Sequence, residues 1–307
     1  MLDTAFERVS LPLAEAFTIA RGTQETAENV VVRIADGSGT TGVGAAAPSA
    51  HYGETPATVE AVLPDLLAAV ESVGDPHARR RIERECRAVV ADNPAAHAAV
   101  DVALADLAAK RLGVPLYRQW GLDPDAAPKT SFTIGLDSTD RMREKAAAAV
   151  EAGHDVLKVK LGTDRDEAIV AAIRDAAPDA RLRVDANAAW TPPEAVRRID
   201  ALVAHDVEFV EQPVPADDPA GLRYVHDRAA LPIAADESCV TLSDVPAVAD
   251  RADVVNLKLM KCGGGPPARR PIQAARAHGL EGVSYIHLAL PTPDSVGSSG
   301  GVGTLDK

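Results

Sequence analysis

Five ionisable residues recur through the second half of the chain at a nearly constant interval. They are Lys160, Asp185, Glu211, Asp236 and Lys258, and the intervals between them are 25, 26, 25 and 22 positions. Each stands at or just after the end of a short apolar segment of the kind that forms a buried β-strand. An interval of this length holds one strand and one helix, so each residue is expected to mark the end of one βα unit.

The residue types in this series indicate metal-assisted proton transfer. Three carboxylates form an all-oxygen ligand set that suits Mg²⁺, and the absence of histidine or cysteine from the series disfavours zinc. A bound Mg²⁺ would stabilise the enediolate that forms when the carbon next to a substrate carboxylate loses its proton. The lysines at the two ends of the series could remove the proton from one face and return it on the other. That chemistry is two-base epimerisation or racemisation.

A lysine acts as a base only when its amine can lose a proton, although its ordinary pKa is about 10.4. Lys158 lies two positions before Lys160 and therefore on the same face of the strand. Its positive charge, with that of the nearby cation, is expected to lower the pKa of Lys160. Lys261 could act on Lys258 in the same way.

Other interpretations exist for each residue taken singly. An acidic residue at a strand end is often a helix N-cap or a solvated rim residue. Asn187, in the segment VDANAAW, could support a metal ligand or could simply be a turn residue. Five ionisable residues in register favour function over these alternatives.

The elements that must position these residues alternate regularly after residue 128. Short apolar strands are predicted at 131–136, 156–161, 182–186, 207–211, 232–235 and 254–259, with a possible seventh at 282–286 and helices between them. Parallel strands closed into a barrel bring their carboxyl ends to one rim, whereas an open doubly wound sheet would spread them along a line. In an eight-stranded ring, the two lysines would stand four strands apart and face each other.

The first part of the chain has a different pattern. Strands are predicted at 4–11 and 29–35, followed by helices at 57–73, 77–90 and 95–112, which together indicate an α+β domain. Residues 121–130 read GLDPDAAPKT and are typical of a linker.

Composition limits the possible partners. The chain has 307 residues, 46% of them hydrophobic and 25% charged, which is ordinary for a globular protein. A net charge of -13 argues against nucleic acid and anionic membranes as partners. Three cysteines without paired spacing, no long apolar run and no secretory signal predict a soluble, cytoplasmic protein without disulfides.

The sequence resembles the enolase superfamily in its muconate-lactonising subgroup, and is most similar to the dipeptide epimerases. The motifs that carry the resemblance are LKVKLG (157–162), RVDANAAW (183–190), VEQPV (210–214), ADES (235–238) and VNLKLMKCGG (255–264). The resemblance covers about residues 1–280. It implies an α/β fold: a TIM-type (β/α) barrel at 129–280, an N-terminal α+β capping domain at 1–128, and a divergent or disordered tail at 281–307.

The resemblance also implies roles for individual residues. Lys160 and Lys258 would be the paired acid/base residues and Lys158 their helper, with Mg²⁺ held by the three acids at 185, 211 and 236. Substrate-binding positions would be Arg21, Thr133, Asn187 and Lys261. FTIARGT (17–23) resembles the flexible specificity loop and SAHYGET (49–55) the second loop of the cap. Arg21 could hold the side-chain carboxylate of a dipeptide such as Ala-Glu, or it could be a solvated loop arginine.

Two departures from the family stand out. A GxGE turn is replaced by the sequence GVGA at 42–45, so a contact between cap and barrel is expected to be missing. The family's seventh strand with its acidic end and its eighth strand with an Asp-x-Asp pair do not appear, and 179 residues from Lys129 onward are fewer than the roughly 200 of a compact eight-unit barrel. The barrel is therefore expected to be incomplete at its C-terminal end, unless the tail or a neighbouring chain closes it.

Several functions stay open at this point. The leading one is a Mg²⁺-dependent isomerase that acts on the α-carbon of a small carboxylate, a dipeptide or an N-acyl amino acid. Muconate cycloisomerisation, o-succinylbenzoate synthesis and N-succinylamino acid racemisation would use the same lysines and metal. A truncated, inactive chain is a further alternative, and a homo-oligomer is possible.

Overall fold

The structure is a computed structural model that describes residues 1–127, 129–285 and 302–304. Contacts divide the described chain into two compact units, each built from separate stretches of sequence. The N-terminal unit contains residues 1–12, 26–127 and 258–270, and the barrel unit contains residues 13–25 and 271–307 together with 128–257, as far as these are described. The predicted domain boundaries at 128 and 280 stay predictions.

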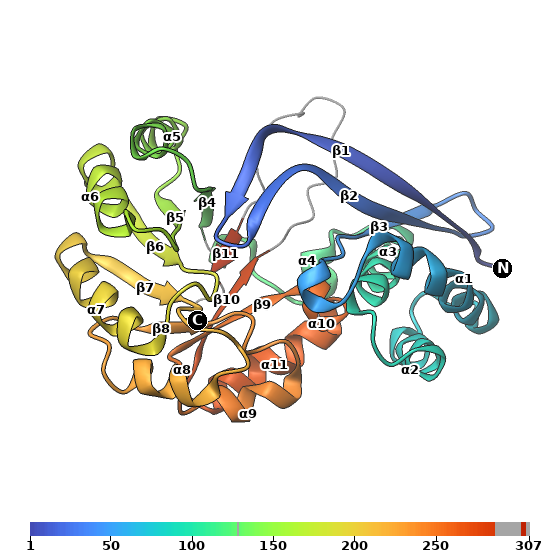
Figure 1. The fold of residues 1–307 in the computed structure, drawn as a ribbon. Coiled ribbons are helices and arrows are strands. Elements are labelled where there is room, and N and C mark those ends of the chain that lie inside the picture. Colours follow the sequence, from blue (N-terminus) through green and yellow to red (C-terminus); the bar gives the residue numbers. More distant parts are fainter. Residues whose placement is uncertain (128, 286–301, 305–307) are drawn as a thin grey trace. The chain divides into compact units, whose positions relative to one another are not determined.

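The N-terminal unit combines a three-stranded sheet, in the order β1-β2-β3, with helices packed together beside β3 (Figure 1). The predicted helices are confirmed, while the strands are longer than expected and β3 was not predicted. The elements are β1 (Asp3–Ile19), β2 (Gly22–Ala35), β3 (Thr41–Ala46), η1 (Ala50–Tyr52), α1 (Pro56–Val73), α2 (Arg79–Val89), α3 (Pro94–Leu112), α4 (Leu116–Gln119), η2 (Pro124–Ala126) and α10 (Leu259–Cys262).

The GVGA segment has a packing role within this unit. Val43 donates its backbone N–H to the Asp106 carboxylate at 2.9 Å. A Cβ atom at Gly42 or Gly44 would overlap the backbone of α3, at the carbonyl oxygens of Ala103 and Ala99 respectively. The two glycines therefore let β3 lie directly against α3, which no larger residue would permit.

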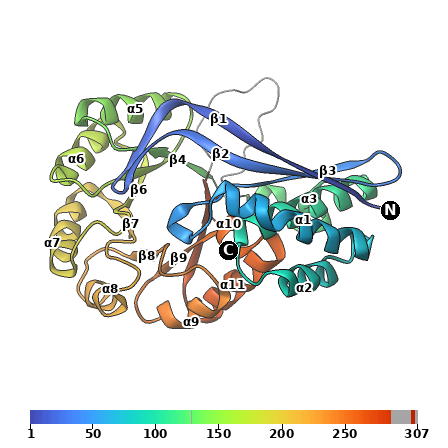
Figure 2. The same ribbon diagram turned by 45° about the vertical axis from the view of Figure 1, so that its right-hand side comes forward.

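The barrel unit alternates strands with helices as the sequence predicts. Its elements are β4 (Thr130–Ile134), α5 (Thr139–Glu151), β5 (Val156–Lys160), α6 (Asp166–Ala176), β6 (Arg181–Asp185), α7 (Pro192–Leu202), η3 (Val203–His205), β7 (Val207–Glu211), α8 (Pro219–His226), β8 (Ile233–Ala235), η4 (Leu242–Asp244), α9 (Val245–Val248), β9 (Val254–Lys258), α11 (Gly265–Ala277), β10 (Glu281–Tyr285) and β11 (Val302–Thr304). Neighbouring strands from β4 to β9 pair in parallel. Helices α5 to α8 lie outside the strands (Figures 1 and 2).

Alternation along each strand separates two environments. On β5, Leu157 and Val159 join the apolar cluster between strands and helices, whereas Lys158 and Lys160 are buried outside that cluster. Successive side chains of a strand point to opposite faces, so the lysines of β5 share the inner face of the barrel. The apolar outer face provides the packing that holds each strand in register.

The C-terminal end of the barrel differs from the pattern of the earlier strands. The predicted seventh strand is confirmed as β10, and the strand order is closed by the short β11, which pairs antiparallel with both β10 and β4. No eighth parallel strand occurs among the described residues, so the enolase-type barrel is incomplete as a (β/α) repeat. The expectation of a divergent or disordered tail at 281–307 stays a prediction: β10 and β11 are the parts of it that the structure describes, and the rest lies outside the described residues.

Two expectations from composition can be compared with the structure. Across residues 1–127, 129–285 and 302–304, none of the helices combines the length and apolar character needed to cross a bilayer. Cys86, Cys239 and Cys262 are all buried. Burial raises the pKa of the Cys86 thiol to about 11, which makes it a poor nucleophile at neutral pH.

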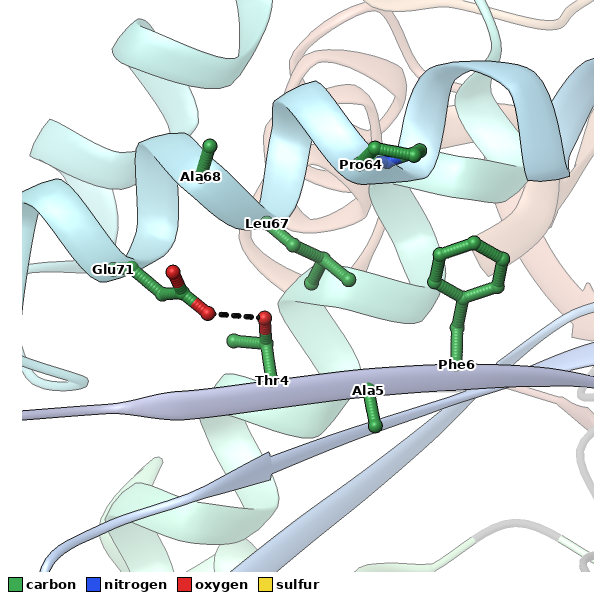
Figure 3. Close-up of a pocket in the computed structure, with 7 residues that line it drawn as sticks. All are labelled: Thr4, Ala5, Phe6, Pro64, Leu67, Ala68 and Glu71. Carbon is green, nitrogen blue, oxygen red and sulfur yellow. Dashed lines mark hydrogen bonds between the residues drawn. The ribbon is translucent and has the colours of Figure 1, made fainter.

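One pocket of about 340 Å³ lies between β1 and α1 in the N-terminal unit (Figure 3). Phe6, Pro64 and Leu67 give it an apolar wall, and Thr4 donates a hydrogen bond of 2.5 Å to Glu71 at its edge. It contains no cluster of ionisable side chains and none of the predicted site residues. The chemistry suggested by the sequence therefore has to be sought at the strand ends of the barrel.

Candidate active site

The register of the barrel strands brings the predicted acidic residues together. Lys160 at the end of β5 pairs in register with Asp185 at the end of β6, and Asp185 pairs with Glu211 at the end of β7. Asp236 directly follows β8, and Lys258 ends β9. One residue per strand end is therefore the observed arrangement as well as the expected one.

Three carboxylates form a compact, fully buried group. One oxygen each from Asp185, Glu211 and Asp236 lie within 4.8 Å of one another, and none of the three side chains is exposed to solvent. Buried carboxylates at this separation repel one another unless cations lie among them. The all-oxygen set, the spacing and the excess negative charge fit Mg²⁺. These three residues are the ones that would hold it.

Lys158 forms ion pairs with two of the acids. Its Nζ lies 2.9 Å from Asp185 Oδ2 and 2.7 Å from Glu211 Oε2, and its side chain is only 3% exposed. Burial lowers the pKa of Lys158, but the three carboxylates outweigh burial and hold that pKa above its usual range. Lys158 therefore keeps its charge at neutral pH.

Lys160 lies in a different electrostatic environment although it contacts the same carboxylate. Its Nζ lies 2.6 Å from Asp185 Oδ2. Burial and the neighbouring Lys158 charge outweigh the attraction of Asp185, and the pKa of Lys160 falls below its usual value. The direction matches the sequence-based expectation, although burial is the larger cause. Asp185, beside two ammonium groups that outweigh its burial, has its pKa held well below its usual range.

The other two predicted lysines, Lys258 and Lys261, lie at the end of β9 and in the short helix α10 that follows it. Lys258 ends β9 and is half-buried, and Lys261 lies in α10 and is 1% exposed. The Lys261 ammonium lies 5.9 Å from the centre of the Tyr52 ring, in the segment that resembles the second loop of the cap. A role for Lys261 in substrate binding stays a prediction, as does the base role of Lys258.

Two amide side chains that sequence reasoning missed orient the acids. Asn256, two residues before Lys258 on β9, donates a hydrogen bond of 2.7 Å to Glu211 Oε1. Gln212 joins the ends of β7 and β8, because its Oε1 accepts the backbone N–H groups of Asp236 and Ser238. Both could have been suspected from their motifs, since Gln212 follows one acid directly and Asn256 shares the strand face of Lys258.

Asn187 is a turn residue and also contacts an acid of the triad, so both interpretations that the sequence left open apply to it. It adopts a left-handed backbone conformation with φ of 47°, as turn asparagines do, and its backbone N–H donates to Asp185 Oδ1 at 2.9 Å. Its side-chain Oδ1 is buried and accepts no hydrogen bond from the described residues. Asn187 thus positions one acid and presents an unused acceptor.

The remaining predicted substrate contacts come from β4 and from the turn between β1 and β2. Thr133 lies in register with Lys158 and is half-buried. Arg21 lies in a two-residue turn and not in a longer loop, because β1 ends at Ile19 and β2 begins at Gly22. Its guanidinium forms an ion pair of 2.7 Å with Glu237 and donates to the Asn187 carbonyl at 3.0 Å, while 34% of its side chain stays exposed. A role for Arg21 in substrate binding stays a prediction.

The fold and these contacts define a class of protein. A (β/α)-type barrel with a buried carboxylate triad and lysines at the carboxyl ends of its strands is built for metal-assisted proton chemistry at a carbon acid. The antiparallel sheet and helices of the N-terminal unit complete the two-part architecture.

Comparison with known proteins identifies the family within that class. Residues 1–121 match the mandelate racemase/muconate lactonizing enzyme N-terminal domain, and residues 141–293 match the enolase C-terminal domain-like family. The chain belongs to the mandelate racemase/muconate lactonizing enzyme family of the enolase superfamily.

Curated relatives and solved structures agree with this assignment. The chain is 39% identical over 278 residues to a hydrophobic dipeptide epimerase of Enterococcus faecalis, covering 88% of this chain and 78% of the relative. It is 36% identical over 270 residues to the L-Ala-D/L-Glu epimerase of Escherichia coli, covering 88% and 80%. The crystal structure of the dipeptide epimerase from Enterococcus faecalis, complexed with Mg and the dipeptide L-Leu-L-Tyr, superimposes with a TM-score of 0.86 at 36% identity, covering 92% of this chain and 81% of that one.

Proposed function

We propose that this protein is a Mg²⁺-dependent dipeptide epimerase, which inverts the α-carbon next to the carboxylate of a dipeptide. The observation that carries the proposal is the buried triad of Asp185, Glu211 and Asp236 with Lys158 and Lys160 at its side. Relatives that match nearly the whole described chain are epimerases of this kind. When bound, Mg²⁺ supplies positive charge that stabilises the enediolate form of the substrate.

Lys160 and Lys258 are assigned to the two proton transfers. β5 and β9 stand four places apart in the closed order of eight strands, and this order supports the assignment of the two lysines to opposite faces of the substrate. Lys160 Nζ takes the α-proton from one face of the substrate, leaving the C–H electron pair in the enediolate. Lys258 delivers a proton to the same carbon from the other face, and the reverse reaction exchanges the two roles.

The environment of Lys160 supports its role as a base. Burial and the neighbouring Lys158 charge lower the pKa of Lys160 toward the working range of an enzyme. Lys158 stays protonated between two carboxylates and balances their charge. One strand therefore carries two amines whose pKa values are shifted in opposite directions.

A cytoplasmic location is part of this proposal. The three cysteines are buried thiols without disulfide bonds, which suits a reducing compartment. A net charge of -13 gives no affinity for anionic membranes.

The test follows the α-proton directly. Purified protein is incubated in deuterated water with Mg²⁺ and a panel of L-Ala-L-Xaa dipeptides, and proton NMR records loss of the α-proton and appearance of the epimer. N-succinyl amino acids in a parallel panel test the racemase alternative. Exchange and epimerisation of at least one dipeptide, lost on chelation and restored by Mg²⁺, is the expected result. Turnover of N-succinyl amino acids alone, or of neither panel, would refute the proposal.

A further inference from the structure

The turn between β1 and β2 lies on the carboxyl ends of the barrel strands. Residues 13–25, called the hairpin tip below, belong to the barrel unit and not to the unit that contains the rest of their strands. The Leu136 N–H donates to the Thr18 carbonyl at 2.8 Å. Arg21 reaches the Asn187 carbonyl and the Glu237 carboxylate.

Two glycines of the barrel, Gly135 and Gly162, allow the hairpin tip to lie close to the barrel backbone. A Cβ atom at Gly162 would lie 2.8 Å from the Cβ of Ala20, and one at Gly135 would lie 3.1 Å from the Phe17 ring. Both distances are shorter than carbon atoms normally tolerate, so the bare glycine backbone is what lets the tip approach. The tip is therefore packed on the barrel as well as hydrogen-bonded to it.

The contact points of the tip follow the proposed catalytic and metal-binding residues directly. Gly162 lies two residues after Lys160, and Asn187 lies two residues after Asp185. Glu237 follows Asp236 without a gap. Any displacement of the tip would consequently act on the segments that fix these groups.

The ion pair between Arg21 and Glu237 joins an arginine whose side chain is 34% exposed to a buried carboxylate. The Glu237 side chain is 2% exposed, and neither of its oxygens accepts a well-aligned hydrogen bond from the described residues. Arg21 is the cation that faces it, at 2.7 Å. A buried carboxylate that depends on one cation holds that cation strongly, because separating them leaves an uncompensated charge.

The hairpin tip has no basic side chain besides Arg21 that could bind an acidic substrate group. Residues 13–25 contain Glu15, Arg21 and Glu25 as their charged side chains, so Arg21 is the tip's one basic residue. Glu15 is itself paired with Arg141 and Lys145 of α5. The side chains next to Arg21 in sequence, from Phe17 to Ala20, are mainly apolar.

We infer that Arg21 is a positioning residue that fastens the hairpin tip through Glu237, and that the enzyme prefers dipeptides whose variable side chain is apolar to those with an acidic one. The inference rests on the proposed function for its substrate class. A guanidinium held by Glu237 and by the Asn187 carbonyl is not available to a substrate carboxylate. Sequence identity does not distinguish a preference for apolar side chains from one for acidic side chains. It is nearly the same for a hydrophobic dipeptide epimerase, at 39%, and for an L-Ala-D/L-Glu epimerase, at 36%.

The test is a double-mutant cycle with two substrates. Arg21→Met, Glu237→Gln and the double variant are compared with wild type for kcat/KM on L-Ala-L-Leu and L-Ala-L-Glu. Wild type should favour L-Ala-L-Leu by at least about tenfold, and each single variant should lose a similar factor, on the order of tenfold, on both dipeptides. The double variant should lose no more than either single variant, because both remove the same contact. Arg21→Lys should recover part of the loss, since it keeps the charge without the planar fork.

Hydrogen exchange of the amides in the tip gives a second measurement that does not need turnover. Exchange should rise at residues 13–25 in Arg21→Met and Glu237→Gln and stay unchanged in Arg8→Met, which removes an exposed arginine paired with Glu28. A loss confined to L-Ala-L-Glu, or a wild-type preference for that dipeptide, would overturn the inference in favour of substrate binding by Arg21. If wild type epimerises no dipeptide, the proposed function fails, and the exchange data still decide whether Arg21 fastens the tip: unchanged exchange in both variants would show that it does not.

Discussion

At the scale of single residues, two lysines that contact the same carboxylate oxygen have pKa values shifted in opposite directions. Lys158 touches two carboxylates, which raise its pKa, whereas Lys160 touches one and also faces the Lys158 charge, and its pKa is lowered. Neighbouring groups whose pKa values are pushed apart are typical of acid/base sites. Both amines are buried, so the difference arises from the one extra carboxylate contact of Lys158 and from the like charge that Lys158 places beside Lys160, and not from residue type.

The two-base assignment predicts a split between exchange and epimerisation. Lys160→Ala and Lys258→Ala should each lower epimerisation by at least about 10³-fold, because one face of the α-carbon then lacks its proton carrier. Each variant should still exchange the α-proton of the one enantiomer that faces its remaining lysine. Proton NMR in deuterated water with separate L,L and L,D dipeptides measures both rates. Lys110→Ala, an exposed lysine of the N-terminal unit, serves as control, and exchange of both enantiomers by either variant would contradict the assignment.

The orientation of Glu211 by Asn256 predicts an effect on metal affinity. Asn256→Leu removes the hydrogen bond to Glu211 Oε1 while keeping the size of the side chain. The Mg²⁺ concentration for half-maximal activity should rise roughly 10- to 100-fold, as for other residues that orient metal ligands. Calorimetric titration with Mg²⁺ checks the same quantity without turnover. An unchanged Mg²⁺ affinity would show that Asn256 merely fills space.

At the scale of elements, close backbone approach and helix capping hold the N-terminal unit together. β3 lies against α3 through two glycines. The first turn of α3 is capped from outside the helix, because the Glu54 carboxylate accepts the Ala95 N–H at 2.9 Å while Asn93 at the N-cap makes no side-chain bond. An anion at a helix N-terminus satisfies free N–H groups and the helix dipole.

Replacement of one of these glycines should be strongly destabilising. The Cβ of Gly44→Ala would overlap the Ala99 carbonyl of α3, so strand and helix must separate, and the free energy of unfolding should fall by at least about 2 kcal/mol. Denaturant unfolding measures the change. Gly37→Ala is the matched control, because a Cβ there meets nothing within 4 Å. Equal stability of the two variants would contradict the close packing of β3 on α3.

The buried cap predicts a pH dependence of stability. Burial raises the pKa of Glu54 above its usual value despite the backbone N–H groups that it accepts. The folded state therefore binds the Glu54 proton more tightly than the unfolded state, and the stability linked to this group is full at low pH and lost as pH rises through the raised pKa. The stability of wild type relative to Glu54→Gln should accordingly fall as the pH rises above the ordinary glutamate pKa of 4.5. Parallel unfolding curves at several pH values test this, and a constant difference would refute it.

At the scale of the whole molecule, closure of the barrel depends on a strand of three residues. β11 pairs with β10 on one side and β4 on the other, both antiparallel. Without it, both neighbours would present unpaired backbone groups, which invite association between chains. The match to this chain covers 78% of one relative and 80% of another.

Disruption of β11 should therefore increase self-association. Gly303→Pro removes a backbone N–H from a strand that has a partner on each side, so a ladder hydrogen bond is lost. Gly303→Ala keeps that N–H and is the control. Light scattering after size-exclusion chromatography should show a rise of average mass with concentration for the proline variant only. Identical masses for both variants would indicate that β11 does not protect the edges.

The sequence determined the chemistry and the repeat that positions it. Ionisable residues at intervals of 22 to 26 positions, each after an apolar strand, were sufficient to predict a barrel with three metal-binding acids, because period and residue type are local properties. Only the tertiary structure decided the partner of Arg21, the orientation of Glu211 by Asn256 and the closing strand. Arg21 and Glu237 are 216 positions apart, and β11 pairs with β4 across more than half of the chain. Contacts of that range depend on how the elements pack, which no periodicity in the sequence records.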